Sequence, residues 1–155
     1  MRGSFVHPVV SVGILLVAAC GSSGSPSQAA SSPTPAASPT VGEASITVAG
    51  TQELILTTLS GMTLYYLTSD VATAPKCAGA CLTHWPPLLS TTTPVGMAGF
   101  SGAWTVVQNA NGAQVAYNGH LLYQFANDKA GGDAKGEGIQ AFGGTWHVVT
   151  PALAA

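Results

Sequence analysis

The chain has 155 residues and a formal net charge of −2, and only 6% of its residues are charged. Globular domains usually carry roughly 25% charged residues, so this chain is unusually neutral. With four Lys and Arg residues in total, it lacks the basic patch that nucleic-acid binding requires. The 19 glycines and 10 prolines indicate many turns and exclude long charged helices. The length is that of one domain.

Residues 1–19 have the features of an export signal. The apolar run from Val9 to Ala19 is too short to cross a hydrocarbon core of about 30 Å as a helix, but it suits the centre of a signal peptide. It ends in Val-Ala-Ala before Cys20, which resembles a bacterial lipobox. The resemblance implies that Cys20 is acylated, becomes the N-terminus after cleavage and anchors the protein to the outer face of the cell membrane. An ordinary secretory peptide is the alternative.

Residues 20–45 consist almost entirely of Gly, Ser, Pro, Ala and Thr. Such a composition has too little apolar bulk to offset the entropy of ordering. We therefore expect a disordered tether that holds the folded part away from the membrane. Folded structure should begin near Ile46 and extend to about Pro151.

The folded part is predicted to be all-β. Polar and apolar residues alternate at its start, and β-branched or aromatic residues gather in further short segments. Turn formers separate these segments, including Asn-Gly at 111–112 and at 118–119. No segment repeats its apolar residues with the helical period of about 3.6 residues, although 79–84 could form one helical turn. The expected strands are 45–49, 53–59, 63–67, 104–108, 114–117, 121–125 and 145–149.

An internal repeat organises this domain. The segments 61–70 and 119–128 carry Gly, Leu, Tyr and Asp in the same register, which indicates a duplicated unit. Neither unit could bury its apolar face alone. We expect a compact antiparallel domain of two related hairpin repeats, about 52–89 and 104–151, packed as a pseudo-twofold pair. Trp85 and Trp146 should each pack beneath the hairpin of their own repeat.

These residues resemble a known bacterial family. Residues 123–128 match the Y-x-(F/W/Y)-x-x-D motif of predicted lipoproteins that are also described as a secreted repeat of unknown function. The first copy departs from it at Leu67, where the family has an aromatic residue. The family has no settled activity, so the resemblance implies no particular chemistry. The positions that carry it are Tyr65, Asp70, Trp85, Pro86, Pro87, Tyr123, Phe125, Asp128 and Trp146.

Cys77 and Cys81 are the remaining cysteines. An exported chain meets an oxidising compartment, so we expect them to form a disulfide, whose short loop contributes about 2 kcal/mol. A redox-active or metal-binding pair is the alternative. The spacing is not the Cys-x-x-Cys of thioredoxin-like sites, and no βαβ pattern surrounds it.

The acidic residues have a structural and a chemical interpretation. Asp70 and Asp128 each end a predicted strand, where a carboxylate commonly accepts backbone N–H bonds. Paired catalytic carboxylates are the alternative, but no His or Ser accompanies both in the same register. The Gly-rich segment 127–138 also holds Asp133 and Glu137. It lacks the spacing of a calcium loop, so we expect a solvated loop.

The histidines are weak metal candidates. If the repeats pack face to face, His84, His120 and His147 could converge with Met62 or Met97 on copper or haem. No two of them have a recognised ligand spacing, so exposed or turn-capping roles are the alternative. No motif for a catalytic nucleophile is present either.

We therefore expect a non-enzymatic, extracytoplasmic lipoprotein that binds or scaffolds a component of the cell envelope. The expected partner besides the membrane is an envelope protein or a small ligand, and no cofactor is required. An envelope accessory protein for copper, haem or electron transfer is the alternative. A hydrolase that uses the two aspartates is the third possibility.

Overall fold

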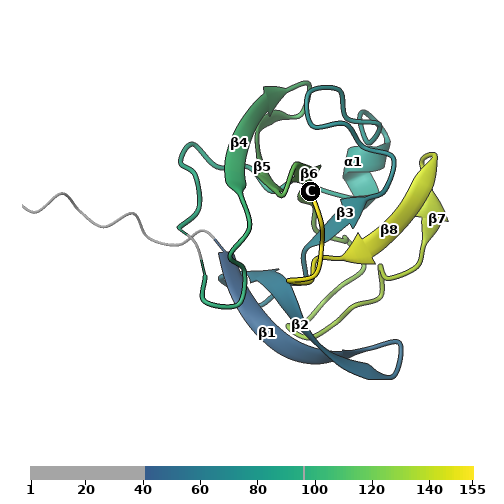
Figure 1. Cartoon of the computed structure of the whole chain (residues 1–155). Helices are drawn as coiled ribbons and strands as arrows, with labels where there is room; N and C mark the ends of the chain where they lie inside the picture. The colour runs from purple at the N-terminus through teal and green to yellow at the C-terminus, as the bar shows by residue number, and fades with distance from the viewer. Residues whose placement is uncertain (1–40, 96) are drawn as a thin grey trace, which may run out of the picture. The chain divides into compact units, whose positions relative to one another are not determined.

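The computed structural model describes residues 41–95 and 97–155. The predicted signal peptide, Cys20 and most of the expected tether lie outside these residues. Within them the chain forms short strands and one helical turn (Figure 1). No helix in this part of the chain is long and apolar enough to span a membrane. The elements are β1 (Val41–Val48), β2 (Thr51–Thr58), β3 (Tyr65–Leu67), α1 (Cys81–His84), β4 (Trp104–Asn109), β5 (Gly112–Tyr117), β6 (His120–Leu121), β7 (Gln140–Ala141) and β8 (Gly144–Val148).

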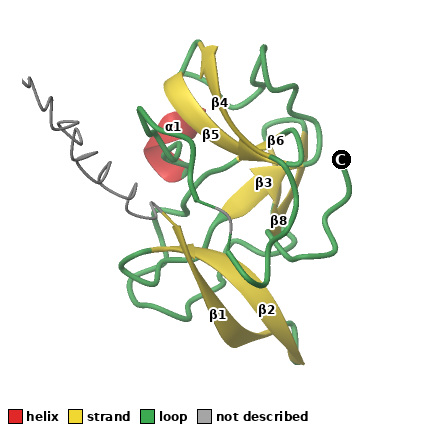
Figure 2. Ribbon diagram, turned by 60° about the vertical axis from the view of Figure 1, so that its left-hand side comes forward, coloured by secondary structure: helices red, strands yellow, loops and turns green. Residues whose placement is uncertain are grey.

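The strands form three antiparallel sheets, so the all-β prediction is confirmed. One sheet is the β1–β2 hairpin (Figure 2), the second has the order β3–β8–β7 (Figure 1), and the third has the order β4–β5–β6. The helical turn expected at 79–84 is α1. The sequence did not predict β7, because it is a two-residue strand within a Gly-rich segment.

The folded part begins earlier than the sequence predicted. Strand β1 starts at Val41 rather than near Ile46, so 41–45 belong to the domain and not to the tether. Val41 is fully buried and packs in a core cluster with Leu56. The pairing of β1 with β2 runs along its whole length, from Val41 opposite Thr58. The small residues of 41–45 resemble the tether in composition, and only the partner strand shows that they are ordered.

The two halves of the domain exchange strands. Strand β3 of the first half pairs with β8 of the second, with Tyr66 opposite His147. In return, the segment after α1 pairs with the second half, where Gln124 N–H donates to the Pro86 carbonyl at 2.8 Å. The halves therefore interlock and do not merely pack side by side.

The hydrogen bonds follow a pseudo-twofold pattern. At its centre, Tyr65 and Tyr123 exchange backbone bonds of 2.8 and 2.9 Å. Away from the centre, Leu56 N–H donates to a carbonyl of the other half at 2.9 Å, and so does its counterpart Val115. The duplication seen in the sequence is thus a duplication of backbone geometry.

Two stacked tryptophans form the middle of the core. The rings of Trp85 and Trp146 are 3.7 Å apart and almost parallel, at 2°. Each also meets the edge of a tyrosine from its own half, Tyr65 at 5.4 Å and Tyr123 at 5.2 Å. The predicted packing of each Trp against its own repeat is confirmed. The direct stack between them was not predicted, and it joins the halves by large apolar surfaces.

Cys77 and Cys81 form the predicted disulfide, with Cα atoms 5.3 Å apart. Both residues are buried and belong to the same core cluster as Trp85 and Trp146. The bond staples the loop that leads into α1. Its burial keeps it away from a redox partner in solution.

Candidate functional site

The duplicated tyrosines and aspartates bond across the two halves. The Tyr65 hydroxyl donates to Asp128 Oδ2 at 2.7 Å, and the Tyr123 hydroxyl donates to Asp70 Oδ2 at 2.6 Å. Each bond joins the tyrosine of one repeat to the aspartate of the other. The matching register of Tyr and Asp in the two copies did not by itself predict these side-chain bonds.

The second oxygen of each aspartate caps a turn, as the sequence predicted. Asp70 Oδ1 accepts the backbone N–H groups of Lys76 at 2.7 Å and of Cys77 at 3.3 Å. Asp128 Oδ1 accepts the N–H of Lys135 at 3.1 Å. Both oxygens of each carboxylate therefore accept hydrogen bonds within the fold.

Burial shifts the pKa values in this network. It raises the pKa of Asp128, although the bonds from Tyr65 and Lys135 act in the opposite direction. Burial also raises the pKa of Tyr65 and of Tyr123 well above the ordinary value, and the hydrogen bond to an aspartate adds to the effect. The tyrosines remain protonated donors at neutral pH.

The Gly-rich loop uses its carboxylates separately and does not gather them. Asp133 Oδ2 accepts hydrogen bonds from the backbone N–H groups of Lys129 and Ala130. It also forms an ion pair with Lys135 Nζ at 2.7 Å. The hydrogen bond from Lys135 has the largest part in lowering the pKa of Asp133 to about 2. No group of three or more His, Cys, Asp or Glu side chains suited to a metal ion occurs among residues 41–95 and 97–155. The loop is thus closed by its own hydrogen bonds.

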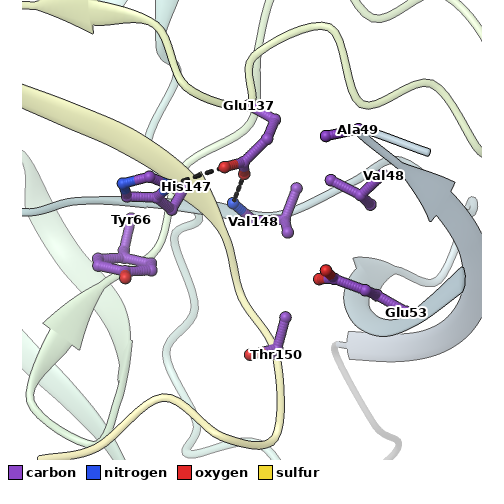
Figure 3. A pocket seen from close by; sticks show the side chains of 8 residues that line it. All are labelled: Val48, Ala49, Glu53, Tyr66, Glu137, His147, Val148 and Thr150. Carbon is purple, nitrogen blue, oxygen red and sulfur yellow. Dashed lines mark hydrogen bonds and ion pairs between the residues drawn. The ribbon is translucent and has the colours of Figure 1, made fainter. Parts of the chain in front are cut away.

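Glu137 connects this loop to strand β8. One carboxylate oxygen lies 2.7 Å from His147 Nδ1, and the other accepts the Val148 N–H at 2.7 Å. The His147 ring lies beside the ring of Tyr66 from β3, with centroids 5.9 Å apart. The imidazole is therefore held by a carboxylate on one side and by an aromatic ring on the other (Figure 3).

These residues border an open cleft of about 290 Å³. In Figure 3, Glu53 of β2 faces the Tyr66 and His147 side across the open centre, with Thr150 below. No hydrogen bond joins the Glu53 carboxylate or the Tyr66 and Thr150 hydroxyls to another residue in the described part of the chain. The cleft thus gathers polar groups that the fold does not use. Its lining residues are Val48, Ala49, Glu53, Tyr66, Glu137, His147, Val148 and Thr150.

The cleft breaks the pseudo-twofold pattern. In the register of the repeat, Tyr66 corresponds to Gln124, and His147, next to Trp146, corresponds to Pro86, next to Trp85. The same backbone pairing occurs at both places, but only one of them carries the aromatic ring and the imidazole. The duplicated side chains hold the fold together, and the side chains that differ form the cleft.

The structure brings together only two of the three histidines proposed as metal candidates. His120 and His147 both contact the Tyr66 ring, with centroids 4.9 and 5.9 Å away. His84 lies exposed on α1, and the Met62 backbone N–H is bonded to the Thr58 hydroxyl. The expected convergence is therefore limited to two histidines around one tyrosine. Glu53, Tyr66 and Thr150 were not predicted from the sequence. Of these, Tyr66 could have been found by looking for positions at which the two repeats carry different residues.

Comparison with known proteins gives one family. The model of the Lipoprotein_15 family, described as a secreted repeat of unknown function, matches residues 47–89 and 105–150. The two matches coincide with the two interlocked halves and together cover more than half of the chain. No significant match was found among curated proteins or among solved structures.

Proposed function

This chain belongs to the family of secreted repeats of unknown function, and from that premise we propose that it is a non-enzymatic binding module of the cell envelope. Its ligand contacts the cleft bordered by Glu53, Tyr66 and His147. A lipid on Cys20 anchors it to the outer face of the membrane.

The main support is that the residues of the repeat motif and the residues of the cleft have different roles. The side chains of the repeat motif are engaged in contacts within the fold, with both oxygens of Asp70 and of Asp128 already bonded. An enzyme that used these carboxylates would need at least one of them open to substrate. The cleft, in contrast, is open and asymmetric, and its Glu53 carboxylate and its Tyr66 and Thr150 hydroxyls have no hydrogen-bond partner among the described residues.

Binding through the cleft can be tested by co-sedimentation with isolated cell envelopes. A Cys20→Ala background removes the acyl chains, so that retention reports protein contacts alone. We expect this protein to sediment with envelopes from the bacterium that produces it, and Glu53→Ala with Thr150→Ala to reduce the bound fraction several-fold. Glu43→Ala, which removes a carboxylate from β1 outside the cleft, is the matched control. Equal retention of all three proteins would remove the cleft from the proposal.

The anchor is tested separately. Protein expressed in its own host should carry acyl chains on Cys20 in intact-mass measurements and should partition into the membrane fraction. The Cys20→Ala protein should appear in the soluble extracytoplasmic fraction. An unmodified Cys20 in the mature protein would contradict anchoring and would leave the binding proposal untouched.

A metal-handling role is the second candidate, and one observation favours it. His147 Nδ1 faces the Glu137 carboxylate at 2.7 Å, an arrangement that orients many metal-bound imidazoles. His120 lies on the same tyrosine ring. If this role is correct, protein purified without chelator should hold stoichiometric copper that His147→Gln removes and His84→Gln retains. Failure to bind copper after reconstitution would eliminate this candidate.

A further inference from the structure

We infer that the cleft recognises a primary ammonium group on its ligand. This inference rests on the proposed binding function and adds the chemical class of the ligand. The charge, the hydrogen-bonding capacity and the size of the cleft each support it.

The charge of the cleft favours a cation. Its titratable side chains include two carboxylates, Glu53 and Glu137. None of the three lysines of the folded part, Lys76, Lys129 and Lys135, lines it. Glu137 is shared with His147 and the Val148 N–H, whereas the Glu53 carboxylate has no bonded partner among the described residues. A cleft lined by one sign of charge attracts ligands of the opposite sign.

The polar groups of the cleft match an ammonium group in their hydrogen-bonding role. His147 Nδ1 is engaged with Glu137 at 2.7 Å, and Figure 3 draws the other ring nitrogen pointing away from the open centre, so the acceptors toward the cleft come from the other side chains. The Glu53 carboxylate accepts, and the Tyr66 and Thr150 hydroxyls can also accept. An ammonium group has three donors and no acceptor, so it complements such a lining. The aromatic ring of Tyr66 adds attraction for a cation nearby.

The size and walls of the cleft favour an organic amine over a bare metal ion or haem. A volume of about 290 Å³ lies just below the range of small-molecule sites, roughly 300–1,000 Å³. The cleft is therefore too small for a macrocycle. The side chains of Val48 and Val148 provide apolar walls that suit a short carbon chain. No cluster of three or more His, Cys, Asp or Glu side chains suited to a metal ion occurs in the described residues. A lysine-like aminoalkyl group fits these limits.

The probe for this inference is n-butylammonium, with n-butanol as the neutral analogue of the same shape. In NMR titrations of the ¹⁵N-labelled full chain, we expect butylammonium to shift the amides of Tyr66, His147 and Thr150 in a saturable manner. Butanol should cause no saturable shift. Glu53→Gln removes the charge at constant size and should weaken butylammonium binding about fivefold, as expected for one charged contact. Glu43→Gln is the control and should bind as the wild type does.

The outcomes separate this inference from the proposal on which it rests. Equal responses to butanol and butylammonium, or no response to butylammonium at the cleft, would overturn the assignment of an ammonium ligand. A cleft response to Cu²⁺ alone would overturn it as well and would favour the metal alternative. In each case the envelope co-sedimentation of the Glu53 and Thr150 variants still decides the binding function, because that measurement makes no assumption about the ligand.

Discussion

At the level of single residues, Tyr65 and Tyr123 each contact several other residues of the core. Each is fully buried, pairs with the other through backbone bonds, meets a tryptophan by its edge and donates its hydroxyl to an aspartate of the opposite half. A buried hydroxyl without a partner costs about 1–3 kcal/mol. The persistence of Tyr and Asp in both copies therefore has a structural cause that requires no catalysis.

The raised pKa values of these two tyrosines predict a loss of stability at alkaline pH. The ordinary tyrosine pKa of 10.0 applies to the unfolded chain, while burial and the aspartate bonds raise the pKa of each in the folded state. The stabilising effect is fully present below pH 10 and is lost as the pH rises further, because the unfolded chain then releases protons that the folded chain keeps. The free energy of unfolding should therefore fall with rising pH above that point. Urea unfolding followed at several alkaline pH values measures the fall, and either Tyr→Phe variant should reduce it.

The bond between Tyr65 and Asp128 can be tested by a double-mutant cycle. Asp128→Ala leaves the Tyr65 hydroxyl buried without its acceptor, so we expect a loss of about 1–3 kcal/mol in the free energy of unfolding. In a Tyr65→Phe background the same substitution should cost less, because no hydroxyl remains to be satisfied. Chemical denaturation of the four proteins provides the coupling energy. Strictly additive effects would show that the 2.7 Å contact does not stabilise the fold.

At the level of elements, three hairpins end in the same kind of tight turn. Their first turn residues are Ala49, Asn118 and Phe142, with φ of 47°, 48° and 55°, and a glycine follows each. Only at Asn118 does the residue suit a positive φ, and there its side chain also accepts the Ala103 N–H at 2.8 Å. At Phe142 a bulky ring occupies a conformation that such residues rarely adopt.

The strained turn predicts a stabilising substitution. Phe142 is 41% exposed, so replacing it removes few apolar contacts, while Asn adopts the required backbone conformation more readily. We expect Phe142→Asn to raise the free energy of unfolding by about 0.5–1 kcal/mol, visible as a higher melting temperature in calorimetry. A lower melting temperature would mean that contacts of the ring outweigh the backbone strain.

At the level of the whole molecule, strand exchange makes the two halves interdependent. Strand β3 has its ladder partner in the other half, and the two tryptophans stack across the same boundary. A separated half would expose the apolar surfaces that now meet there and would leave unpaired strand edges. The repeat is therefore a unit of sequence but not a unit of folding.

This interdependence can be measured with fragments. We expect the peptides 41–96 and 97–155 to show no cooperative thermal unfolding when studied alone. Mixed in equal amounts, they should recover the near-ultraviolet circular dichroism of the Trp85–Trp146 stack. Cooperative unfolding of either fragment alone would show that a half folds independently, which contradicts the interlocked arrangement.

Features that depend on neighbouring residues could be predicted from the amino-acid order alone. Alternating polarity and turn formers located most strands and the helical turn at α1, and the matching register of 61–70 and 119–128 revealed the duplication. Three features could be seen only in the folded chain: the exchange of strands, the Trp85–Trp146 stack and the start of β1 at Val41. Each of them depends on which distant segment supplies the partner. The same holds for the cleft, whose Glu53, Tyr66 and His147 lie on different strands and share no spacing. Local sequence patterns indicate which secondary structure a segment can form. Pairing between distant segments determines which side chains contact one another.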